Sequence, residues 1–289
     1  MTIKTILVSL DGTETTDAVL ATAFAVVRRL GVHADVLHVR TDSTDAVPAF
    51  GEAMTSRMVD DLVSSSHADA EARATTARTH FEDFCARNKI PITDEKPTGQ
   101  GISARWIEET GRKDKVMAHR GRLADLVVVG RPTRSANVTS SMVVNALFDT
   151  GRPVLVVPPE APETVGGKIA IAWNGSAECA RAIGGATNFF SHANGVVILT
   201  AEGDRVPHSV VEDLADYLVF HGIDAEQKII AKTPEAHLGG GSLLDACAST
   251  GADLLVMGAY RVSRFREMIL GNATQQVLEN TTLPVLMGH

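Results

Sequence analysis

The residues best placed to do chemistry lie near the end of the chain, in a segment rich in small side chains. Gly271, Asn272 and Ala273 come directly before a helical run over 274–279, so free backbone N–H groups are expected at a helix start. Such a start attracts an anion, typically a phosphate group. Gly258 lies earlier in the same segment. The alternative is that Gly258 and Gly271 only permit tight turns.

Three arginines lie between these two glycines, at Arg261, Arg264 and Arg266. A guanidinium near a helix start can hold phosphate through two parallel hydrogen bonds. The alternative is that all three side chains are solvated on an exposed loop. The lysine of a Walker-type loop does not follow.

Two short apolar runs frame this segment. Residues 254–257 are too few for a helix and end at Gly258, which is typical of a buried strand in a parallel sheet. Residues 283–287 form a similar run and are expected to be a neighbouring strand. The segment therefore predicts a strand, a glycine-bearing loop, a helix and a strand.

The order of elements in the first half of the chain repeats in the second. The first half begins with a strand over 5–10, a helix over 17–30 and a strand over 34–39, and residues 169–173, 179–190 and 196–200 repeat this order. ADLVVVG at 124–130 matches ADLLVMG at 252–258. The repetition predicts two similar α/β domains, 1–158 and 168–289, joined by a proline- and glycine-rich linker over 159–167. Each is expected to be an open parallel five-stranded sheet with helices on both faces.

The first half carries an additional segment that the second half lacks. Residues 52–88 are rich in alanine, glutamate and arginine, and one helix of that length would exceed 50 Å at about 1.5 Å per residue. We expect the serine run at 64–66 to break it. Residues 52–66 would then lie outside the shared core and project or pack on the partner domain. The counterpart in the second half, about 209–221, is short.

The segment 253–289 resembles the nucleotide loop of the universal stress protein family. That loop reads Gly, two residues, Gly, nine residues, Gly, then Ser or Thr. Gly258 and Gly271 match the first and last glycines, whereas Arg261 occupies the middle glycine position and Asn272 the hydroxyl position. The phrases MGAY and LGNAT also match. The resemblance covers nearly the whole chain and implies two tandem Rossmann-like universal stress domains.

The resemblance implies a nucleotide crevice between the first and fourth strands of a domain. In the family, an aspartate after the first strand contacts the nucleotide, and Asp11 matches it in the first half. Asn174 replaces it in the second half. The alternative for Asp11 is an Asx-type turn or a helix cap. The first half has Arg131 and Pro132 after Gly130, and it lacks the later glycine that would complete a phosphate loop.

These considerations predict an ATP site of modest affinity in the second half. Its expected residues are Asn174, Gly175, Ser176, Gly258, Arg261, Gly271, Asn272, Ala273 and Thr274, with Asp11 as the first-half counterpart. The resemblance implies a stress-response or regulatory protein that is not an enzyme. It also implies an internal pseudo-dimer with its pairing edges at 154–157 and 285–287, to which a further homodimer could be added. The alternatives are an interaction module that has lost nucleotide binding, or an ATP-hydrolysing or adenylating enzyme.

Composition narrows the class of protein further. The net charge of -8 argues against a general nucleic-acid binder. The first apolar run is far too short for a membrane span or a signal-peptide core, which predicts a cytoplasmic protein. Cys85, Cys179 and Cys247 are far apart in sequence, so we expect buried thiols rather than a zinc or disulfide site. The histidines form no metal-binding pattern.

Overall fold

The computed structural model describes residues 2–40, 56–95, 101–131, 137–201, 208–230, 240–259 and 272–289. Four of the candidate residues lie outside these ranges, namely Arg261, Arg264, Arg266 and Gly271.

Within the residues that the structure describes, each half contains five strands and four helices in the same alternating order, as the sequence predicted. The first half consists of β1 (Thr5–Leu10), α1 (Thr16–Leu30), β2 (His33–Arg40), α2 (Ser56–Asn88), β3 (Ser103–Thr110), α3 (Lys113–Gly121), β4 (Leu126–Gly130), α4 (Asn137–Asp149) and β5 (Val154–Val157). The second half consists of β6 (Lys168–Ala172), α5 (Ala177–Phe190), β7 (Gly195–Ala201), α6 (His208–Phe220), β8 (Ala225–Ile230), α7 (Gly240–Thr250), β9 (Leu254–Gly258), α8 (Asn272–Asn280) and β10 (Val285–Gly288).

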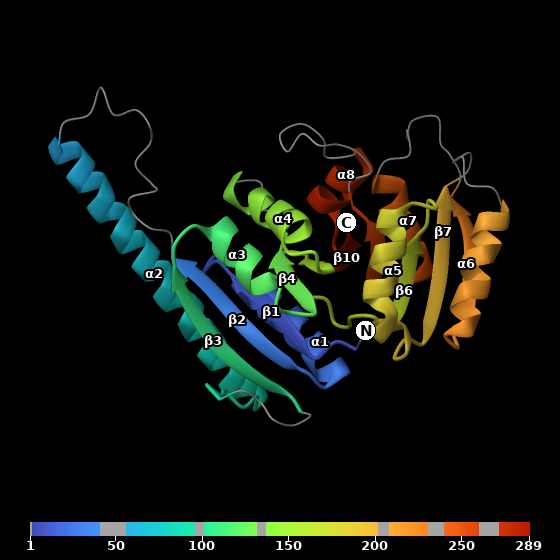
Figure 1. Ribbon diagram of the computed structural model, residues 1–289, viewed down its shortest axis with the longest axis horizontal. Helices are drawn as coiled ribbons and strands as arrows, with labels where there is room; N and C mark the ends of the chain where they lie inside the picture. Colours follow the sequence, from blue (N-terminus) through green and yellow to red (C-terminus); the bar gives the residue numbers. More distant parts are fainter. Residues whose placement is uncertain are drawn as a thin grey trace.

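The strands form one continuous sheet, in the order β3-β2-β1-β4-β5-β10-β9-β6-β7-β8 (Figure 1). The expectation of two separate five-stranded sheets was therefore wrong. The order within the halves is the same, because β1 lies between β2 and β4 just as β6 lies between β7 and β9. An unpaired terminal strand would expose a row of backbone N–H and C=O groups, and joining the two terminal strands satisfies them.

The junction between the halves is the antiparallel pair β5–β10, which confirms the expected pairing edges. Leu155 faces Leu286, and Val154 and Val156 face Met287 and Val285. Leu155 and Leu286 hold the same position in the two repeats, since each follows a Pro-Val pair. Where a residue faces its own counterpart in the other repeat, a twofold axis passes between the two residues. The halves are therefore related by a pseudo-twofold axis through these two leucines.

Helices cover both faces of the sheet and bury its apolar side chains. Helices α1, α2, α5 and α6 pack on one face, and α3, α4, α7 and α8 pack on the other. Both clusters contain residues from the two halves, so each face has one hydrophobic core running across the junction. All three cysteines are buried and free, as the sequence predicted.

An aspartate at the start of β4 and its repeat at the start of β9 hold the first strand of each half. The Asp125 carboxylate accepts hydrogen bonds from the backbone N–H groups of Lys4 and Thr5, at 2.8 and 3.1 Å. The Asp253 carboxylate accepts equivalent bonds from Gly167 and Lys168, both at 2.9 Å. The repeated ADL motif is thus explained by strand positioning.

Helix α2 is a single helix of 33 residues, so the expected break at the serine run does not occur. Serine is a moderate helix former that costs only a few tenths of a kcal/mol per residue, which is too little to stop a helix. From Ala70 onward, the helix buries a stripe with helical spacing that includes Ala74, Ala77 and Phe81. The described side chains before Ala70 are exposed, and this end of α2 projects away from the sheet (Figure 1).

We predict that deleting residues 52–66 leaves the rest of the chain folded, because the described side chains of α2 that contact the core begin at Ala70. Urea unfolding followed by circular dichroism should show one cooperative transition, with a midpoint close to that of the full chain. Loss of cooperative unfolding in the deletion variant would show that the segment belongs to the core.

Candidate functional site

A cavity of about 240 Å³ opens in the second half at the carboxyl ends of the strands. It lies where strand order reverses, between β6 and β9, which is the usual ligand position in open α/β sheets. Its lining is mainly apolar, and the polar groups come from the turn after β6. The lining residues are Ala172, Trp173, Asn174, Cys179, Leu199, Ala201, Ile230, Leu243, Met257, Gly258 and Ala273.

The turn after β6 holds Asn174 at the rim of this cavity. Its side-chain oxygen Oδ1 accepts a hydrogen bond from the backbone N–H of Ser176 at 3.0 Å, which closes an Asx turn. The Ser176 hydroxyl in turn caps α5 by accepting a bond from the backbone N–H of Cys179 at 3.3 Å. Gly175 allows this turn because its backbone has a positive φ of 72°. The amide nitrogen Nδ2 of Asn174 donates to none of the residues that the structure describes.

The Cys179 thiol also belongs to this rim. Its sulfur Sγ donates to Asn174 Oδ1 at 3.1 Å and to the carbonyl oxygen of Ala172 at 3.3 Å. The thiol therefore helps to fix the Asn174 side chain. Sequence reasoning missed this role, because Cys179 was expected to be only a small buried residue.

Gly258, at the end of β9, is required by close packing. A Cβ atom added there would lie 2.6 Å from the backbone nitrogen of Cys179 and 2.8 Å from the carbonyl carbon of Glu178. Both are backbone atoms of α5, so the helix itself would have to move. Gly130 holds the same position in the first half, where an added Cβ would meet Val19 at 3.2 Å. The glycine at this position therefore lets a helix approach the end of the fourth strand.

The opposite side of the cavity is formed by the start of α8. Ala273 lines the cavity, and Thr274 is buried in the first turn of the helix. Asn272 begins the helix, two residues earlier than the sequence predicted, and its side chain is outside the described part. The structure thus brings Asn174, Gly258 and Ala273 to one cavity, with Gly175, Ser176 and Thr274 adjacent to it.

Asp11, the first-half counterpart, is used within its own turn. Its carboxylate accepts hydrogen bonds from the backbone N–H of Thr13 at 3.1 Å and from the Thr13 hydroxyl at 2.7 Å. Gly12 follows it with a φ of 73°, and a Cβ there would lie 2.5 Å from the carbonyl oxygen of Arg73 in α2. Helix α2 therefore packs directly against this turn of the first half. The equivalent turn of the second half lies at the rim of the cavity instead.

Polar side chains approach one another at the carboxyl ends of the first-half strands. Burial lowers the pKa of Lys113, and the nearby Asp11 carboxylate only partly opposes this shift. Burial also lowers the pKa of His38, whose Nδ1 lies 2.9 Å from the carbonyl oxygen of Leu10. A neutral imidazole that donates from Nδ1 fits this contact. Sequence reasoning missed Lys113, because its proximity to Asp11 arises only when the strands pair.

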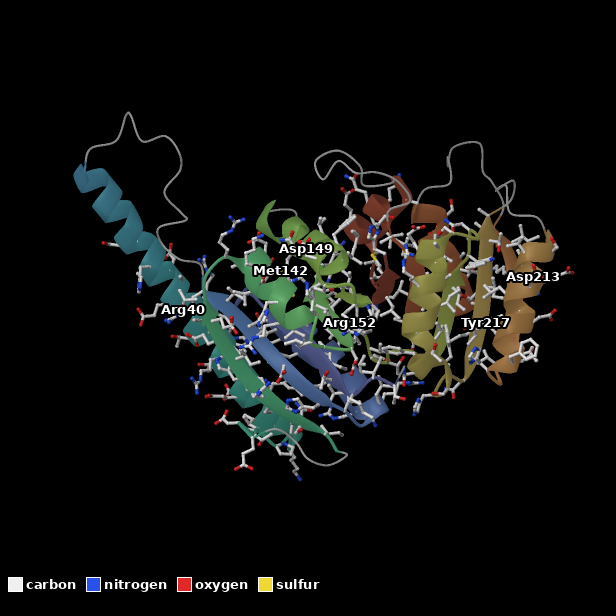
Figure 2. All side chains as sticks on the ribbon, viewed as in Figure 1. Arg40, Met142, Asp149, Arg152, Asp213 and Tyr217 are labelled. Atoms are coloured by element: carbon white, nitrogen blue, oxygen red, sulfur yellow. The ribbon has the colours of Figure 1, made fainter. Side chains whose placement is uncertain are left out.

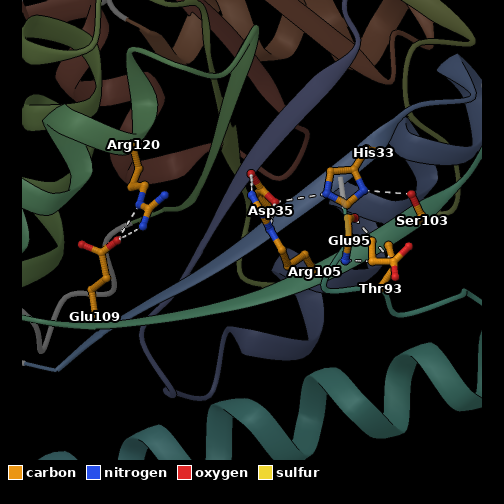
Figure 3. Close-up of polar contacts among 8 residues, drawn as sticks. All are labelled: His33, Asp35, Thr93, Glu95, Ser103, Arg105, Glu109 and Arg120. Atoms are coloured by element: carbon orange, nitrogen blue, oxygen red, sulfur yellow. Dashed lines mark hydrogen bonds and ion pairs between the residues drawn. The ribbon is translucent and has the colours of Figure 1, made fainter. Parts of the chain in front are cut away.

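A serine, a histidine and an aspartate form a hydrogen-bonded row on β2 and β3 (Figure 3). His33 lies 2.8 Å from the Ser103 hydroxyl and 3.1 Å from the Asp35 carboxylate, which also receives two bonds from Arg105 at 2.8 and 2.9 Å. Such a row can activate a serine only if the hydroxyl reaches a substrate. Ser103 is 9% exposed, and Asp35 is already neutralised by Arg105. We therefore interpret the row as a structural network.

A second cavity, of about 260 Å³, lies between the two halves beside α5. Arg152 and Arg181 are among its lining residues, but both have internal partners. Arg152 donates to the carbonyl oxygen of Arg122 at 2.8 Å, and Arg181 pairs with Glu178 at 3.1 Å. Each of these arginines therefore makes its polar contact within its own half.

Two further classes of site find no support in the described residues. No group of three or more histidine, cysteine, aspartate or glutamate side chains is arranged to hold a metal ion there. Among the same residues, no helix is long and apolar enough to cross a membrane.

Comparison with known proteins places the second half in a family. Residues 167–289 match the family model described as the Universal stress protein family. A universal stress protein from Archaeoglobus fulgidus DSM 4304 has a similar structure, with a TM-score of 0.68, 16% identity, and coverage of 98% of this chain and 97% of that chain. A putative universal stress protein from Pseudomonas aeruginosa UCBPP-PA14 matches with a TM-score of 0.57, 14% identity, and coverage of 98% and 92%.

The same fold also occurs in the cytoplasmic domain of a prokaryotic cation chloride cotransporter. That domain matches with a TM-score of 0.50 and 10% identity, over 100% of this chain and 96% of that chain. At such identities the likeness shows the fold alone. No curated protein matches the sequence.

We predict that Gly258→Ala destabilises the protein by about 1–3 kcal/mol, because the new methyl group overlaps backbone atoms of α5. The matched control is Gly184→Ala within α5, where an added Cβ meets nothing within 4 Å. Alanine is the better helix former, so the control should gain about 0.5–1 kcal/mol. Free energies of urea unfolding measure both, and equal effects would contradict the packing argument.

We predict that Asp35→Asn destabilises the protein by about 1–3 kcal/mol at neutral pH, because it leaves Arg105 without its charged partner. Burial raises the pKa of Asp35, but hydrogen bonds from His33 and Arg105 outweigh it and hold the pKa below its ordinary value. A lowered carboxyl pKa stabilises the fold above the unfolded pKa, and this contribution is lost as the pH falls through the folded pKa. The difference between wild type and variant should therefore shrink in acid, and a pH-independent difference would rule out this origin.

Proposed function

We propose that the chain, whose second half matches the universal stress protein family model, is a cytoplasmic stress-response or regulatory protein of that family. We propose further that it binds a nucleotide, with ATP as the first candidate, in the crevice of the second half.

The observation that supports nucleotide binding most directly is the cavity at the point where strand order reverses. Its walls include Leu199, Ile230, Leu243 and Met257, which offer apolar surface to a flat base. The start of α8 lies at the same cavity, and the backbone N–H groups of a helix start suit phosphate oxygens. An apolar wall on one side and a helix start on the other match the two ends of a nucleotide.

Asn174 supplies the remaining polar contact in this proposal. Its oxygen Oδ1 is already occupied by Ser176 and Cys179, so the group left for a ligand is the amide Nδ2 with its two donors. A ribose hydroxyl or a phosphate oxygen can accept from it. A neutral amide makes a weaker bond than the aspartate of the family motif, which supports a modest affinity. The cavity is also slightly smaller than the roughly 300–1,000 Å³ usual for ligand sites.

The two halves differ in a way that favours the second as the binding half. In the first half the Asp11 carboxylate is bonded to Thr13, and α2 packs on the adjoining Gly12. Lys113 contributes a positive charge beside the same carboxylate. In the second half the corresponding turn borders an open cavity.

We propose binding without turnover. The residues described around the cavity include one titratable side chain, the Cys179 thiol, and no acid or histidine that could serve as a general base. The proposed role is therefore that of a nucleotide-responsive regulator.

The test is calorimetric titration of the full chain with ATP. We expect Ala273→Leu to weaken binding by at least about tenfold, because the larger side chain occupies the part of the cavity beside the start of α8, where the phosphate groups would lie. The control, Asp11→Ala, changes the equivalent turn of the first half and should leave the affinity unchanged. Absence of binding in the wild type would favour an interaction module, and loss of binding in Asp11→Ala alone would move the site to the first half.

Alkylation of cysteines gives a second readout in the same samples. Burial raises the pKa of Cys85 to about 11 and that of Cys247 to about 12, so their thiolates are scarce at neutral pH. Cys179 lines the cavity but is itself buried, so its reaction with iodoacetamide depends on access through the cavity, and bound ATP should slow it. Unchanged labelling of Cys179 at saturating ATP would contradict binding in this crevice.

A further inference from the structure

The continuous sheet ends in two edge strands, β3 and β8, and the first of these is protected. Its beginning is covered by the segment at Pro91–Thr93, where the N–H of Thr93 bonds to Ala104 and the N–H of Ala104 bonds to Pro91, both at 2.9 Å. Its charged side chains are also committed within the domain. Arg105 pairs with Asp35, Glu108 with Arg40 and Glu109 with Arg120. Such features prevent a further strand from pairing at an edge.

The second edge, β8, lacks such a cover among the described residues. Four of its residues, from Glu226 to Ile229, are exposed. Ile229 is 64% exposed, although isoleucine is a residue that sheets usually bury. Ala225 packs toward the α6 side and Ile230 toward the α7 side, so Gln227 and Ile229 share the α6 face while Glu226 and Lys228 share the α7 face.

Helix α6 adds exposed apolar side chains at the same end of the molecule, where Asp213 and Tyr217 are labelled in Figure 2. Val219 is 61% and Phe220 is 88% exposed. The flank of α6 that carries Val210 faces inward, because the Val210 carbonyl accepts a bond from Trp173 at 3.2 Å. Val219 lies on the opposite flank by helical spacing, and it therefore faces the outer edge beside β8.

The sequence of β8 is complementary to itself when two copies run antiparallel. If Gln227 faces Gln227 of the second copy, then Glu226 faces Lys228 and Ala225 faces Ile229, and each pair occurs twice. Directly opposed residues lie on the same face, as these pairs require. Moving the axis by one residue would oppose Glu226 to Glu226 or Lys228 to Lys228. Charge thus favours the register centred on Gln227 over the two registers next to it.

We propose that the β8 edge is a homodimer interface, in which two copies of the chain pair β8 with β8 around a twofold axis through Gln227. The same axis brings Ile229 of one copy toward Ala225 and the end of α6 in the other. The exposed isoleucine at one end of the strand thereby meets the exposed Val219 at the other end. The proposed contact is of the same kind as the contact between β5 and β10. Both are antiparallel pairs of edge strands around a twofold axis.

Sedimentation and light scattering of the full chain test this proposal. We expect a concentration-dependent dimer whose dissociation constant rises about tenfold in Glu226→Lys and in Lys228→Glu, because either change opposes like charges twice. The double variant Glu226→Lys with Lys228→Glu restores both pairs and should restore the dimer. Leu123→Ser, which removes an exposed leucine away from this edge, is the control and should dimerise like the wild type. Thermal unfolding checks that each variant is folded.

Disulfide trapping tests the register independently. Directly opposed Cα atoms in an antiparallel pair lie about 4.5–5.5 Å apart, which is within reach of a disulfide. Mild oxidation of Gln227→Cys should therefore give a covalent dimer, whereas Glu226→Cys, which faces Lys228, should not. A wild-type chain that stays monomeric, charge variants that dimerise like the wild type, or equal cross-linking of the two cysteine variants would each overturn the proposal.

Discussion

The antiparallel pairing of β5 with β10 is the interaction on which the rest of the architecture depends. Each of these strands is the last in its half and is fully buried, with only four residues to hold it. Through this pairing two half-sheets share their edges and two hydrophobic cores become continuous across the junction. Because the pair is antiparallel, the strands of the two halves point in opposite directions. At the junction the carboxyl ends of β5 and β10 therefore lie at opposite edges of the sheet, and each half has its own ligand crevice at the carboxyl ends of its strands.

The two repeats share the contacts that position their strands but differ in the side chains around their crevices. The frame is held by equivalent contacts, such as the bonds from Asp125 and Asp253 to the start of the first strand. The first half has closed its turn with α2 and placed a lysine beside Asp11. The second half has kept an apolar cavity with an amide at its rim. The difference lies in side chains and one long helix, since the strand order is the same.

Much of this fold could be predicted from local patterns. The first strand was predicted to its final bounds, and the repeated ADL motif located the equivalent strands β4 and β9, because these buried strands leave short apolar runs that end at glycine. Helix α2 was misjudged, because a serine run is a visible pattern whereas the buried stripe from Ala70 depends on the sheet beneath it. The edges that join the two halves were implied only by the family resemblance and not by the residues themselves, since strand edges have no local signature, and the merging of the two sheets into one was not predicted.

The candidate site could be predicted only in outline. Asn174, Gly258 and Ala273 reach one cavity as the repeat pattern suggested. The role of Gly258 could not be read from sequence, because it depends on the distance to the backbone of α5. Lys113 and the Ser103–His33–Asp35 row were missed for a related reason. Their members are far apart in the chain, and only strand pairing brings them together.

During synthesis of the chain, the β5–β10 junction cannot form until the second half has been translated. The residues of β5 leave the ribosome about 130 residues before those of β10, because the other elements of the second half are translated between them. At about 5–20 residues per second, the nascent first half waits on the order of ten seconds with the bare apolar edge Val-Leu-Val-Val. During that interval the edge is open to pairing with other chains, so we expect translation speed over the second half to influence the yield of correctly folded protein.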